Sequence, residues 1–315
     1  MKKKILEFDI LRSIAVVWII AVWHFSNYYS STSSFGQIVN NNICRDVTYI
    51  MLSLFMLLSG VLTNSCNIAD KESIKAYYLK KIKRFYPLYV IAAITLFFTT
   101  IPSFVSFYSG YQQLFLSLFG MASLYKQAPS TLWFMDMLLL FIMVTPLLVY
   151  KYKAHSFFRI ILMVFLYGMF FVLSKKTNIV DTRFIRYMPF YMIGLLLTPA
   201  KFLELANKYG WVAFILAILI RLLPFHHLFS EMLGYCLIIF WGGKMALLYC
   251  KYLNSPIVGN IVSFISYSSM CAYFFHRQLY AMGILFGLPL FLLPIIVFLL
   301  SYCVQKTYDS IVKLI

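Results

Sequence analysis

The chain has 315 residues, of which 62% are hydrophobic and 12% are charged. Soluble domains contain roughly 45–50% apolar and about 25% charged residues, so this composition excludes a soluble single-domain enzyme. A membrane span takes about 20 residues, so about ten spans would use about 200 residues and leave only short loops. We therefore expect an all-α protein, a polytopic membrane helical bundle of about 10 transmembrane helices, in a single membrane-embedded domain over residues 1–315.

The formal net charge of the chain is +17, from 27 Lys and Arg residues against 10 Asp and Glu residues. The basic residues gather in short runs between apolar segments, as they do in the cytoplasmic loops of membrane proteins. This distribution indicates the lipid bilayer as a partner and no nucleic acid. The 6 cysteines lie far apart, and no Cys or His spacing in the sequence is typical of a metal site, so we expect no metal.

The N-terminus resembles a secretory signal peptide, because the lysines at positions 2–4 precede an apolar run. That run contains Asp9, Arg12 and His24, and it shows no small-residue cleavage site. We therefore expect the run to be retained as the first transmembrane helix.

Ten apolar segments are predicted to span the membrane. A further segment, 111–125, is apolar enough to lie at the interface, to re-enter the membrane, or to form an eleventh span. The ten predicted spans are 9–29, 45–64, 85–102, 131–150, 156–174, 185–199, 209–223, 230–250, 260–280 and 285–304.

The distribution of basic residues predicts how these spans are oriented. With the N-terminus inside, the inner loops carry most of the Lys and Arg residues, so both termini are predicted to be cytoplasmic. Four bases on the predicted outer side break this rule, and they mark either a miscounted span or a basic patch that faces an anionic substrate. They are Lys175, Lys176, Arg183 and Arg186.

Ionisable residues inside a span cost about 2.5–3.5 kcal/mol on insertion scales and mark candidate functional sites. Asp9 and Arg12 lie three residues apart on one helical face, so they could pair with each other or reach the interface. His24 lies about 18 Å further along the helix, at 1.5 Å per residue. Because Trp23 and Phe25 flank it, His24 is either a hydrogen-bonded interfacial residue or a catalytic base.

A basic amphipathic segment, KESIKAYYLKKIKRFYPLY at 71–89, precedes the third predicted span. Lys81 and Arg84 are three residues apart and share a helical face, with Lys80 and Lys83 beside them. Such a cluster could bind anionic lipid headgroups. It could equally hold the phosphates of a soluble cofactor.

Two later spans also contain polar or aromatic residues of interest. Asp136 lies beside Trp133 in the fourth span, and His276 and Arg277 lie near the end of the ninth. A tryptophan in such a position is typical of the aromatic belt at a membrane interface.

Six segments carry motifs that occur in a fixed order along the chain. They are FDILRSIAVVWIIAVWH at 8–24, FMLLSGVL at 55–62, KKIKRFYPLY at 80–89, LWFMDMLLLF at 132–141, PFYMIGLLL at 189–197 and SYSSMCAYFFHRQLY at 266–280. In this order and spacing they resemble the acyltransferase-3 family of integral membrane acyltransferases, over nearly the whole chain. No hydrolase-like domain follows the last span, so the chain resembles the stand-alone members.

The sequence departs from the family pattern at two places. The family usually has ten residues between the first-helix Arg and His, whereas eleven separate Arg12 from His24. Each residue of an α-helix is turned by about 100° around the axis from the one before. A residue eleven positions after Arg12 would therefore lie about 20° from it around the axis, whereas His24, twelve positions after it, would lie about 120° away. A π-bulge in this helix would restore the shared face. In the basic segment, Lys81 replaces the first Arg of an R-x-x-R motif, which removes a bidentate contact.

The resemblance implies a plasma-membrane enzyme that transfers an acyl group, usually acetyl, from acetyl-CoA to a hydroxyl of a cell-surface polysaccharide or its lipid-linked precursor. His24 would act as the general base, which is worth about 10²–10⁴-fold in rate. Arg12, with Asp9 as its neighbour, would position the donor or stabilise developing negative charge.

The resemblance also implies binding sites for both substrates. The CoA phosphates would be held by Lys81 and Arg84, with Lys80 beside them, and the candidate substrate-binding residues are Trp133 and His276. The competing interpretation is a transporter or exporter of a glycan or lipid intermediate, which would use the same buried charges as a substrate path. The order of the motifs favours the acyltransferase.

Overall fold

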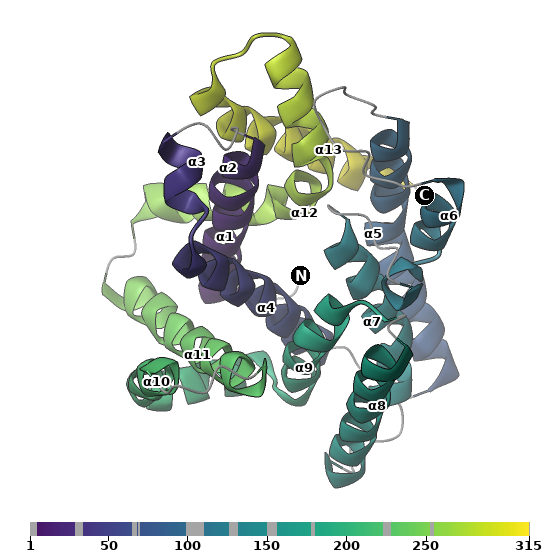
Figure 1. Cartoon of the computed structure of the whole chain (residues 1–315), viewed down its shortest axis with the longest axis vertical. Coiled ribbons are helices and arrows are strands. Elements are labelled where there is room, and N and C mark those ends of the chain that lie inside the picture. The colour runs from purple at the N-terminus through teal and green to yellow at the C-terminus, as the bar shows by residue number, and fades with distance from the viewer. Residues whose placement is uncertain are drawn as a thin grey trace. The chain divides into compact units, whose positions relative to one another are not determined.

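A computed structural model describes residues 5–28, 34–64, 68, 70–98, 110–125, 132–149, 156–177, 180–222, 228–252 and 255–314. Every regular element within these ranges is a helix, which confirms the all-α prediction (Figure 1). The lysines at positions 2–4 lie outside the described residues. The elements are α1 (Leu6–Val17), η1 (Trp18–His24), α2 (Phe25–Tyr28), α3 (Ser34–Val39), α4 (Asn42–Asn64), α5 (Lys71–Phe98), α6 (Tyr111–Leu118), η2 (Ala122–Tyr125), α7 (Trp133–Val149), α8 (Ser156–Thr177), α9 (Thr182–Leu196), α10 (Pro199–Leu222), α11 (Leu228–Tyr252), α12 (Pro256–Leu285), η3 (Leu290–Leu292) and α13 (Leu293–Leu314).

Each predicted span overlaps a helix in the described residues, but the helices do not all have the same character. In the described ranges, 6 helical segments are long and apolar enough to cross a membrane, and they belong to α4, α8, α10, α11, α12 and α13. The apolar helix α7 is shorter, with 17 residues. The count of ten transmembrane helices stays a prediction.

Two segments differ from their predicted form. The 8 residues of α6 extend for about 12 Å, well short of the roughly 30 Å hydrocarbon core, so segment 111–125 does not form an eleventh span. The helix α5 has 28 residues and begins at Lys71, well before the predicted span 85–102. The basic segment and residues 85–98 of the third predicted span are therefore one continuous helix, and residues 99–102 lie outside the described residues.

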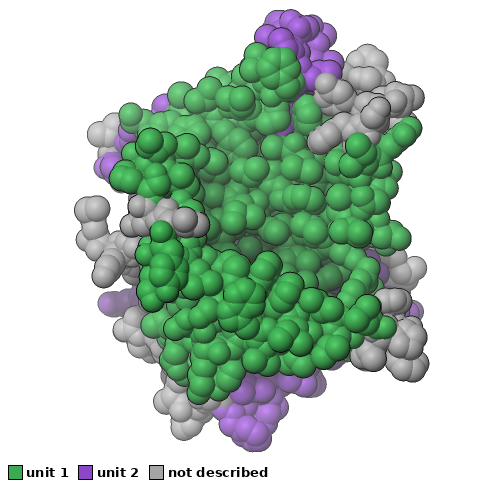
Figure 2. Space-filling model, turned by 90° about the vertical axis from the view of Figure 1, so that its left-hand side faces the viewer, with its two compact units in different colours: residues 1–65, 193–273, 291–306 green, residues 66–192, 274–290, 307–315 purple. Residues whose placement is uncertain are grey.

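The chain divides into two units, shown in green and purple in Figure 2. Unit 1 comprises residues 1–65, 193–273 and 291–306, and unit 2 comprises residues 66–192, 274–290 and 307–315. The first part of α12 belongs to unit 1 and its last part to unit 2. A single membrane-embedded domain over residues 1–315 stays a prediction.

Close helix packing in unit 1 depends on glycines. The helices α10 and α11 lie side by side (Figure 1). A Cβ atom at Gly210 would lie 2.5 Å from the Cβ of Lys244, and one at Gly243 would lie 2.9 Å from the Cβ of Ala206. Real Cβ atoms do not approach so closely, so only glycine permits this spacing between the two backbones.

The same principle explains the glycines of two sequence motifs. A Cβ atom at Gly194, in the PFYMIGLLL motif, would meet the carbonyl oxygen of Leu57 and lie 3.0 Å from the Cα of Gly60, in the FMLLSGVL motif. Small residues let helix backbones approach closely within a membrane. The two motifs therefore meet at one helix contact in unit 1.

Replacing Gly194 by alanine is expected to destabilise the protein, because the new methyl group would overlap the backbone of α4. Overpacking of this kind costs typically about 1–3 kcal/mol. Gly168→Ala on α8 is the matched control, since nothing lies within 4 Å of a Cβ atom at that position. Thermal unfolding of the two purified variants in one detergent measures the difference, and equal melting temperatures would contradict the prediction.

Candidate active site

The middle of the first predicted span is a π-helix, between the α-helices α1 and α2. Trp18–His24 is π-helical, and the backbone amide of Phe25 donates to the carbonyl of Ile20, five residues earlier. Such a stretch places one more residue in a turn than an α-helix does, and it is frequent at functional sites.

The π-helix changes which residues share a face of the first helix. In an uninterrupted α-helix, His24 would lie about 120° away from Arg12 around the axis. The wide turn takes up one extra residue, so His24 returns to within about 20° of Arg12. The structure thus confirms the π-bulge that the eleven-residue spacing required for a shared face.

A hydrogen bond to α4 fixes the start of the π-helix within unit 1. The indole nitrogen of Trp18 donates to the hydroxyl of Thr48 at 3.0 Å. The Thr48 hydroxyl in turn donates to the carbonyl of Cys44 at 2.8 Å. His24, at the other end of the stretch, is half-buried.

A serine on α12 joins the two charges of the first helix. The buried Asp9 accepts a hydrogen bond from the hydroxyl of Ser266 at 2.6 Å, and Arg12 donates to the same hydroxyl at 3.3 Å. The Arg12 guanidinium also lies 3.8 Å from Asp9. A hydroxyl has one proton to donate and lone pairs to accept, so Ser266 can serve both partners at once. The structure thus favours pairing of Asp9 and Arg12.

The sequence analysis did not identify Ser266 as a functional residue. It is the first residue of the motif at 266–280, but it lies 254 positions from Arg12, and no local pattern connects the two. One turn away, the hydroxyl of Ser13 donates to the carbonyl of Val262 at 2.9 Å. The two contacts set the register of α1 on α12.

Ser266→Ala is expected to lower the stability of the protein, because it removes the hydroxyl that bridges Asp9 and Arg12. Hydrogen bonds to charged groups contribute about 1.5–3 kcal/mol. Ser268→Ala is the matched control, since the Ser268 hydroxyl bonds only within α12, to the carbonyls of Phe264 and Ile265. Thermal unfolding should show the larger loss for Ser266→Ala, and a larger loss for the control would rule out the bridging role.

The basic segment begins at a capped helix end in unit 2. The Ser73 amide donates to the Asp70 carboxylate at 2.7 Å, and the Asp70 amide donates to the Ser73 hydroxyl at 3.0 Å. These reciprocal bonds are a capping arrangement that starts a helix at a defined residue. The bonds from Ser73 also lower the pKa of Asp70 below its usual value.

Aromatic rings hold the cations of this segment. The ammonium of Lys81 lies 5.6 Å from the ring centre of Tyr77 and 5.7 Å from that of Phe85. The guanidinium of Arg84 lies 5.4 Å from the ring centre of Phe85. Lys81 is half-buried, whereas Lys80 and Arg84 are exposed. The two motif cations thus share one aromatic ring, as expected for residues three apart on a helix.

The same segment is tied to α7 beside a proline. Pro146 has no amide proton, so the carbonyl of Ile142 lacks its helical donor. The hydroxyl of Tyr77 lies 3.5 Å from this carbonyl, and the hydroxyl of Tyr78 donates to the next one, on Met143, at 2.6 Å. Two tyrosines of the basic segment therefore bond α5 to the interrupted part of α7.

A second proline lies in α5 itself, just after the basic cluster. Pro87 leaves the carbonyl of Lys83 without its helical donor, and the hydroxyl of Tyr308 on α13 donates to this carbonyl. The end of α13, which belongs to unit 2, is therefore bonded to α5 at the residue next to Arg84.

Trp133 lies at the start of α7 in unit 2, beside a network of polar contacts that includes Arg183. The guanidinium of Arg183 lies 4.7 Å from its ring centre, and Tyr187 lies 5.4 Å from it. Arg183 also forms a bidentate pair with Asp181, because its Nη2 donates to Oδ2 at 2.5 Å and its Nε donates to Oδ1 at 3.0 Å. One of the four bases predicted on the outer side is thus neutralised by a carboxylate.

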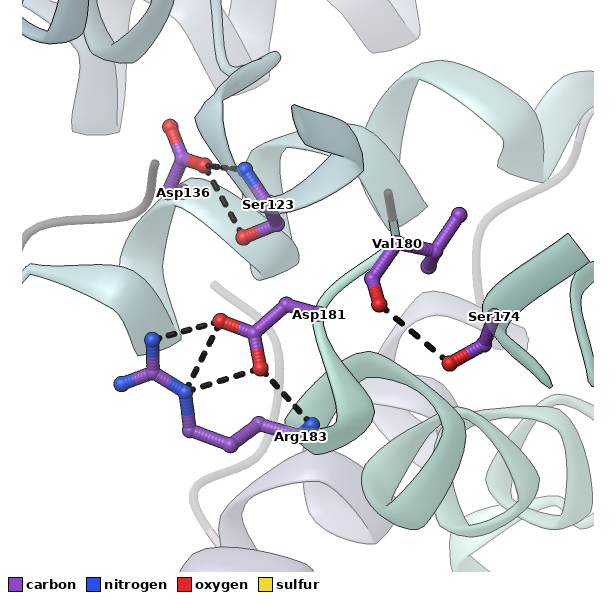
Figure 3. A network of polar contacts seen from close by, with 6 residues as sticks. All are labelled: Ser123, Asp136, Ser174, Val180, Asp181 and Arg183. Carbon is purple, nitrogen blue, oxygen red and sulfur yellow. Dashed lines mark hydrogen bonds and ion pairs between the residues drawn. The ribbon is translucent and has the colours of Figure 1, made fainter. Parts of the chain in front are cut away.

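The neighbouring Asp136 is fully buried and accepts several hydrogen bonds. Its carboxylate accepts from the amide of Ser123 at 2.7 Å, from the Ser123 hydroxyl at 3.0 Å and from Tyr89 at 3.1 Å. Asp181 is bonded to the same segment, because its amide donates to the Ser123 carbonyl at 3.0 Å. Figure 3 shows the two aspartates with their partners Ser123 and Arg183. This network orders the chain around Trp133.

His276 lies in the part of α12 that belongs to unit 2, and it is fully buried. Its ring meets that of Tyr280 edge-on, with 6.1 Å between the ring centres. Close by, the amide group of Gln278 forms a hydrogen bond of 3.2 Å with the hydroxyl of Thr95 on α5. These contacts place His276 in the interior of unit 2.

The predicted site residues fall into two groups. The three catalytic candidates share the first helix of unit 1, whereas the binding candidates lie on three helices of unit 2. In the described part of the chain, no group of three or more His, Cys, Asp or Glu side chains could hold a metal ion. The first group is Asp9, Arg12 and His24; the second is Lys80, Lys81 and Arg84 on α5, Trp133 on α7 and His276 on α12.

These features define a helical membrane protein with paired charges and a histidine on its first helix and a cationic segment on a later one. A family model described as an acyltransferase domain matches residues 5–304. The chain belongs to this family, acyltransferase-3, and is a membrane acyltransferase. Comparison with curated proteins and with solved structures finds no match.

Proposed function

We propose that the protein transfers an acyl group, usually acetyl, from acyl-CoA to a hydroxyl of a cell-surface polysaccharide or its lipid-linked precursor. The main support is the π-helix of the first span, which returns His24 to the face that carries Arg12. In a member of an acyltransferase family, a shared face would let one elongated acyl donor contact both a proton acceptor and, about 18 Å away along the helix, a cation.

In the proposed reaction, the acceptor hydroxyl attacks the thioester carbonyl of the acyl donor. His24 takes the hydroxyl proton, a new C–O ester bond forms, the C–S bond breaks, and CoA leaves as the thiolate, which is then protonated. A positioned general base contributes about 10²–10⁴-fold to such a step. Arg12, about 18 Å along the helix from His24, would position another part of the acyl donor on the same face.

The contacts of Arg12 suit this role. Asp9 and Ser266 orient its guanidinium, yet 23% of the Arg12 side chain remains exposed. A cation held by a buried carboxylate is pre-organised, so little reorganisation is needed when it binds an anionic part of the donor. We therefore assign Asp9 the role of positioning Arg12.

The donor would be bound by Lys81 and Arg84, with Lys80 nearby. CoA carries several phosphate charges, and basic side chains recognise phosphate oxygens through charge-assisted hydrogen bonds. The exposure of Arg84 and the aromatic support of Lys81 fit such binding. Trp133 and His276 stay proposed substrate-binding residues.

The proposed setting is the plasma membrane, with both termini cytoplasmic. This orientation would place the basic segment where cytosolic acyl-CoA can reach it without crossing lipid. The proposed partners are acyl-CoA, the glycan or lipid-linked glycan acceptor, and the bilayer.

If His24 is the base, His24→Ala should lower kcat by about 10²–10⁴-fold while the KM for acetyl-CoA stays nearly constant. Removing a polar group from a span should not impair membrane insertion. Acetyl-CoA consumption by purified protein with an added glycan acceptor measures both constants, and size-exclusion elution checks the fold. A well-folded His24→Ala variant with full activity would refute the role. A wild-type protein that consumes no acetyl-CoA would favour the exporter instead.

The donor site is tested by comparing bases along α5. Arg84→Ala should raise the KM for acetyl-CoA about tenfold or more, since a hydrogen bond to a charged group contributes about 1.5–3 kcal/mol. Arg84→Lys should have a smaller effect, and Lys75→Ala, at an exposed base of the same helix, is the control. A lipid-anchoring segment loses about 1 kcal/mol per base whichever base is removed. Equal, small effects of Arg84→Ala and Lys75→Ala would therefore exclude the CoA role.

A further inference from the structure

The end of α8 and the start of α9, both in unit 2, carry an excess of positive charge. Residues 175–186 contain four bases and one acidic residue, Asp181. All 10 acidic residues of the chain lie within the described ranges, so no carboxylate side chain is left out of this balance. With the buried Asp136 included, because it interacts electrostatically with Asp181, two positive charges remain. The bases are Lys175, Lys176, Arg183 and Arg186.

Two of these bases are exposed lysines in the last turn of α8. Among the described residues, no carboxylate pairs with Lys175 or Lys176. The hydroxyl of Ser174 donates to the carbonyl of Val180 at 3.2 Å, which ties this end of α8 to the segment before α9 (Figure 3). The lysines are therefore held near Arg183, which follows Val180 by three residues.

Arg183 is fixed in position but still has hydrogen-bond donors to offer. A guanidinium has five N–H donors in a planar fork. Asp181 engages Nε and Nη2 of Arg183, at 3.0 and 2.5 Å. In the part of the chain that the structure describes, no acceptor bonds Nη1, which points away from Asp181 in Figure 3. Both N–H groups of Nη1 and the second one of Nη2 can therefore hold another oxyanion.

The surroundings of Arg183 leave that edge accessible. The Arg183 side chain is 35% exposed, whereas that of Asp181 is 9% exposed. The guanidinium lies over the ring of Trp133, 4.7 Å from its centre, and the Asp181 amide donates to the carbonyl of Ser123 at 3.0 Å. A side chain restrained in this way loses little conformational freedom when it binds a ligand. The exposed edge of Arg183 is thus pre-organised.

We propose that the acceptor is an acidic glycan, and that the bases at the end of α8 and the start of α9 bind its carboxylate or phosphate groups. Arg183 forms paired hydrogen bonds with one oxyanion. An arginine neutralised by Asp181 would also accept a neutral hydroxyl, so the selection for negative charge comes from Lys175 and Lys176. These bases lie on the predicted outer side, where a cell-surface glycan would be found. The inference rests on the proposed acyl transfer and names the charge of its acceptor.

The experiment measures the binding of two trisaccharides to the full chain, purified in an uncharged detergent, without acyl-CoA. Trigalacturonate and galactotriose have the same rings and linkages, but the first carries carboxylates in place of hydroxymethyl groups. Isothermal titration calorimetry should give a dissociation constant at least about tenfold lower for trigalacturonate, and added salt should reduce this difference. Galactotriose binding as tightly as trigalacturonate would overturn the proposal.

Pyrophosphate, added as a competitor, distinguishes the two sources of negative charge. Tighter binding of pyrophosphate than of trigalacturonate assigns the site to the diphosphate of a lipid-linked precursor, and weaker binding assigns it to an acidic sugar. A protein that binds neither anion would overturn the proposal.

Variants locate the binding at these bases. Arg183→Gln should weaken the binding of trigalacturonate about tenfold or more, because it removes charge-assisted hydrogen bonds. Arg45→Gln, at an exposed arginine of α4 in unit 1, is the matched control and should bind normally. A folded Arg183→Gln variant with a lower melting temperature but unchanged affinity would show that the side chain is only structural, and would overturn the proposal.

A double variant covers the case in which Arg183→Gln does not fold because Asp181 loses its partner. Replacing Lys175 and Lys176 together by glutamine should weaken the binding about threefold and make it less sensitive to salt. Unchanged affinity in this variant would also overturn the proposal. Because no acyl donor is present, these failures would leave the proposed acyl transfer standing, whereas a protein that binds trigalacturonate but consumes no acetyl-CoA would refute the transfer and keep the site.

Discussion

Within the hydrocarbon core of a bilayer no water is present, so backbone polar groups need partners inside the protein. Prolines lie inside three of the described helices, at Pro87, Pro146 and Pro189, and at the first two a tyrosine hydroxyl from another helix donates to the carbonyl that the proline leaves without a donor. The π-helix meets the same requirement differently, because its amides bond to carbonyls five residues back. The helices that carry the site candidates are thus distorted without losing these hydrogen bonds.

The first helix shows how such a distortion can serve a site. One extra residue between Arg12 and His24 would turn the two side chains apart in a regular helix, and a wide turn cancels the rotation. The turn is fixed at its start by the bond from Trp18 to Thr48. The π-helix thereby accommodates the extra residue between Arg12 and His24, and the two side chains remain on one face of the helix.

Much of this arrangement could be predicted from the sequence. Apolar runs located the helices, and the spacing of Asp9 and Arg12 indicated that they share a face. What the sequence could not supply were contacts between distant segments, such as the bond of Ser266 to Asp9 across 257 positions. The hydrophobic periodicity also did not predict that α5 begins at Lys71, because charged residues interrupt the pattern in its first turns. The helix start is set instead by the capping hydrogen bonds of Asp70.

The pairing of charges separates two kinds of base in this protein. Three arginines lie against aspartates, and each pair adds no net charge to its surroundings; they are Arg12 with Asp9, Arg183 with Asp181 and Arg221 with Asp46. Across the described ranges, no such ion pair neutralises Lys80, Lys83 or Arg84, all exposed on α5. Paired arginines hold helices and side chains in place, whereas an excess of unpaired bases attracts polyanions over a distance. The proposed binding of acyl-CoA therefore depends on the unpaired bases of α5. The proposed catalysis depends on the pre-organised Arg12 and on the position of His24 on the same helix face.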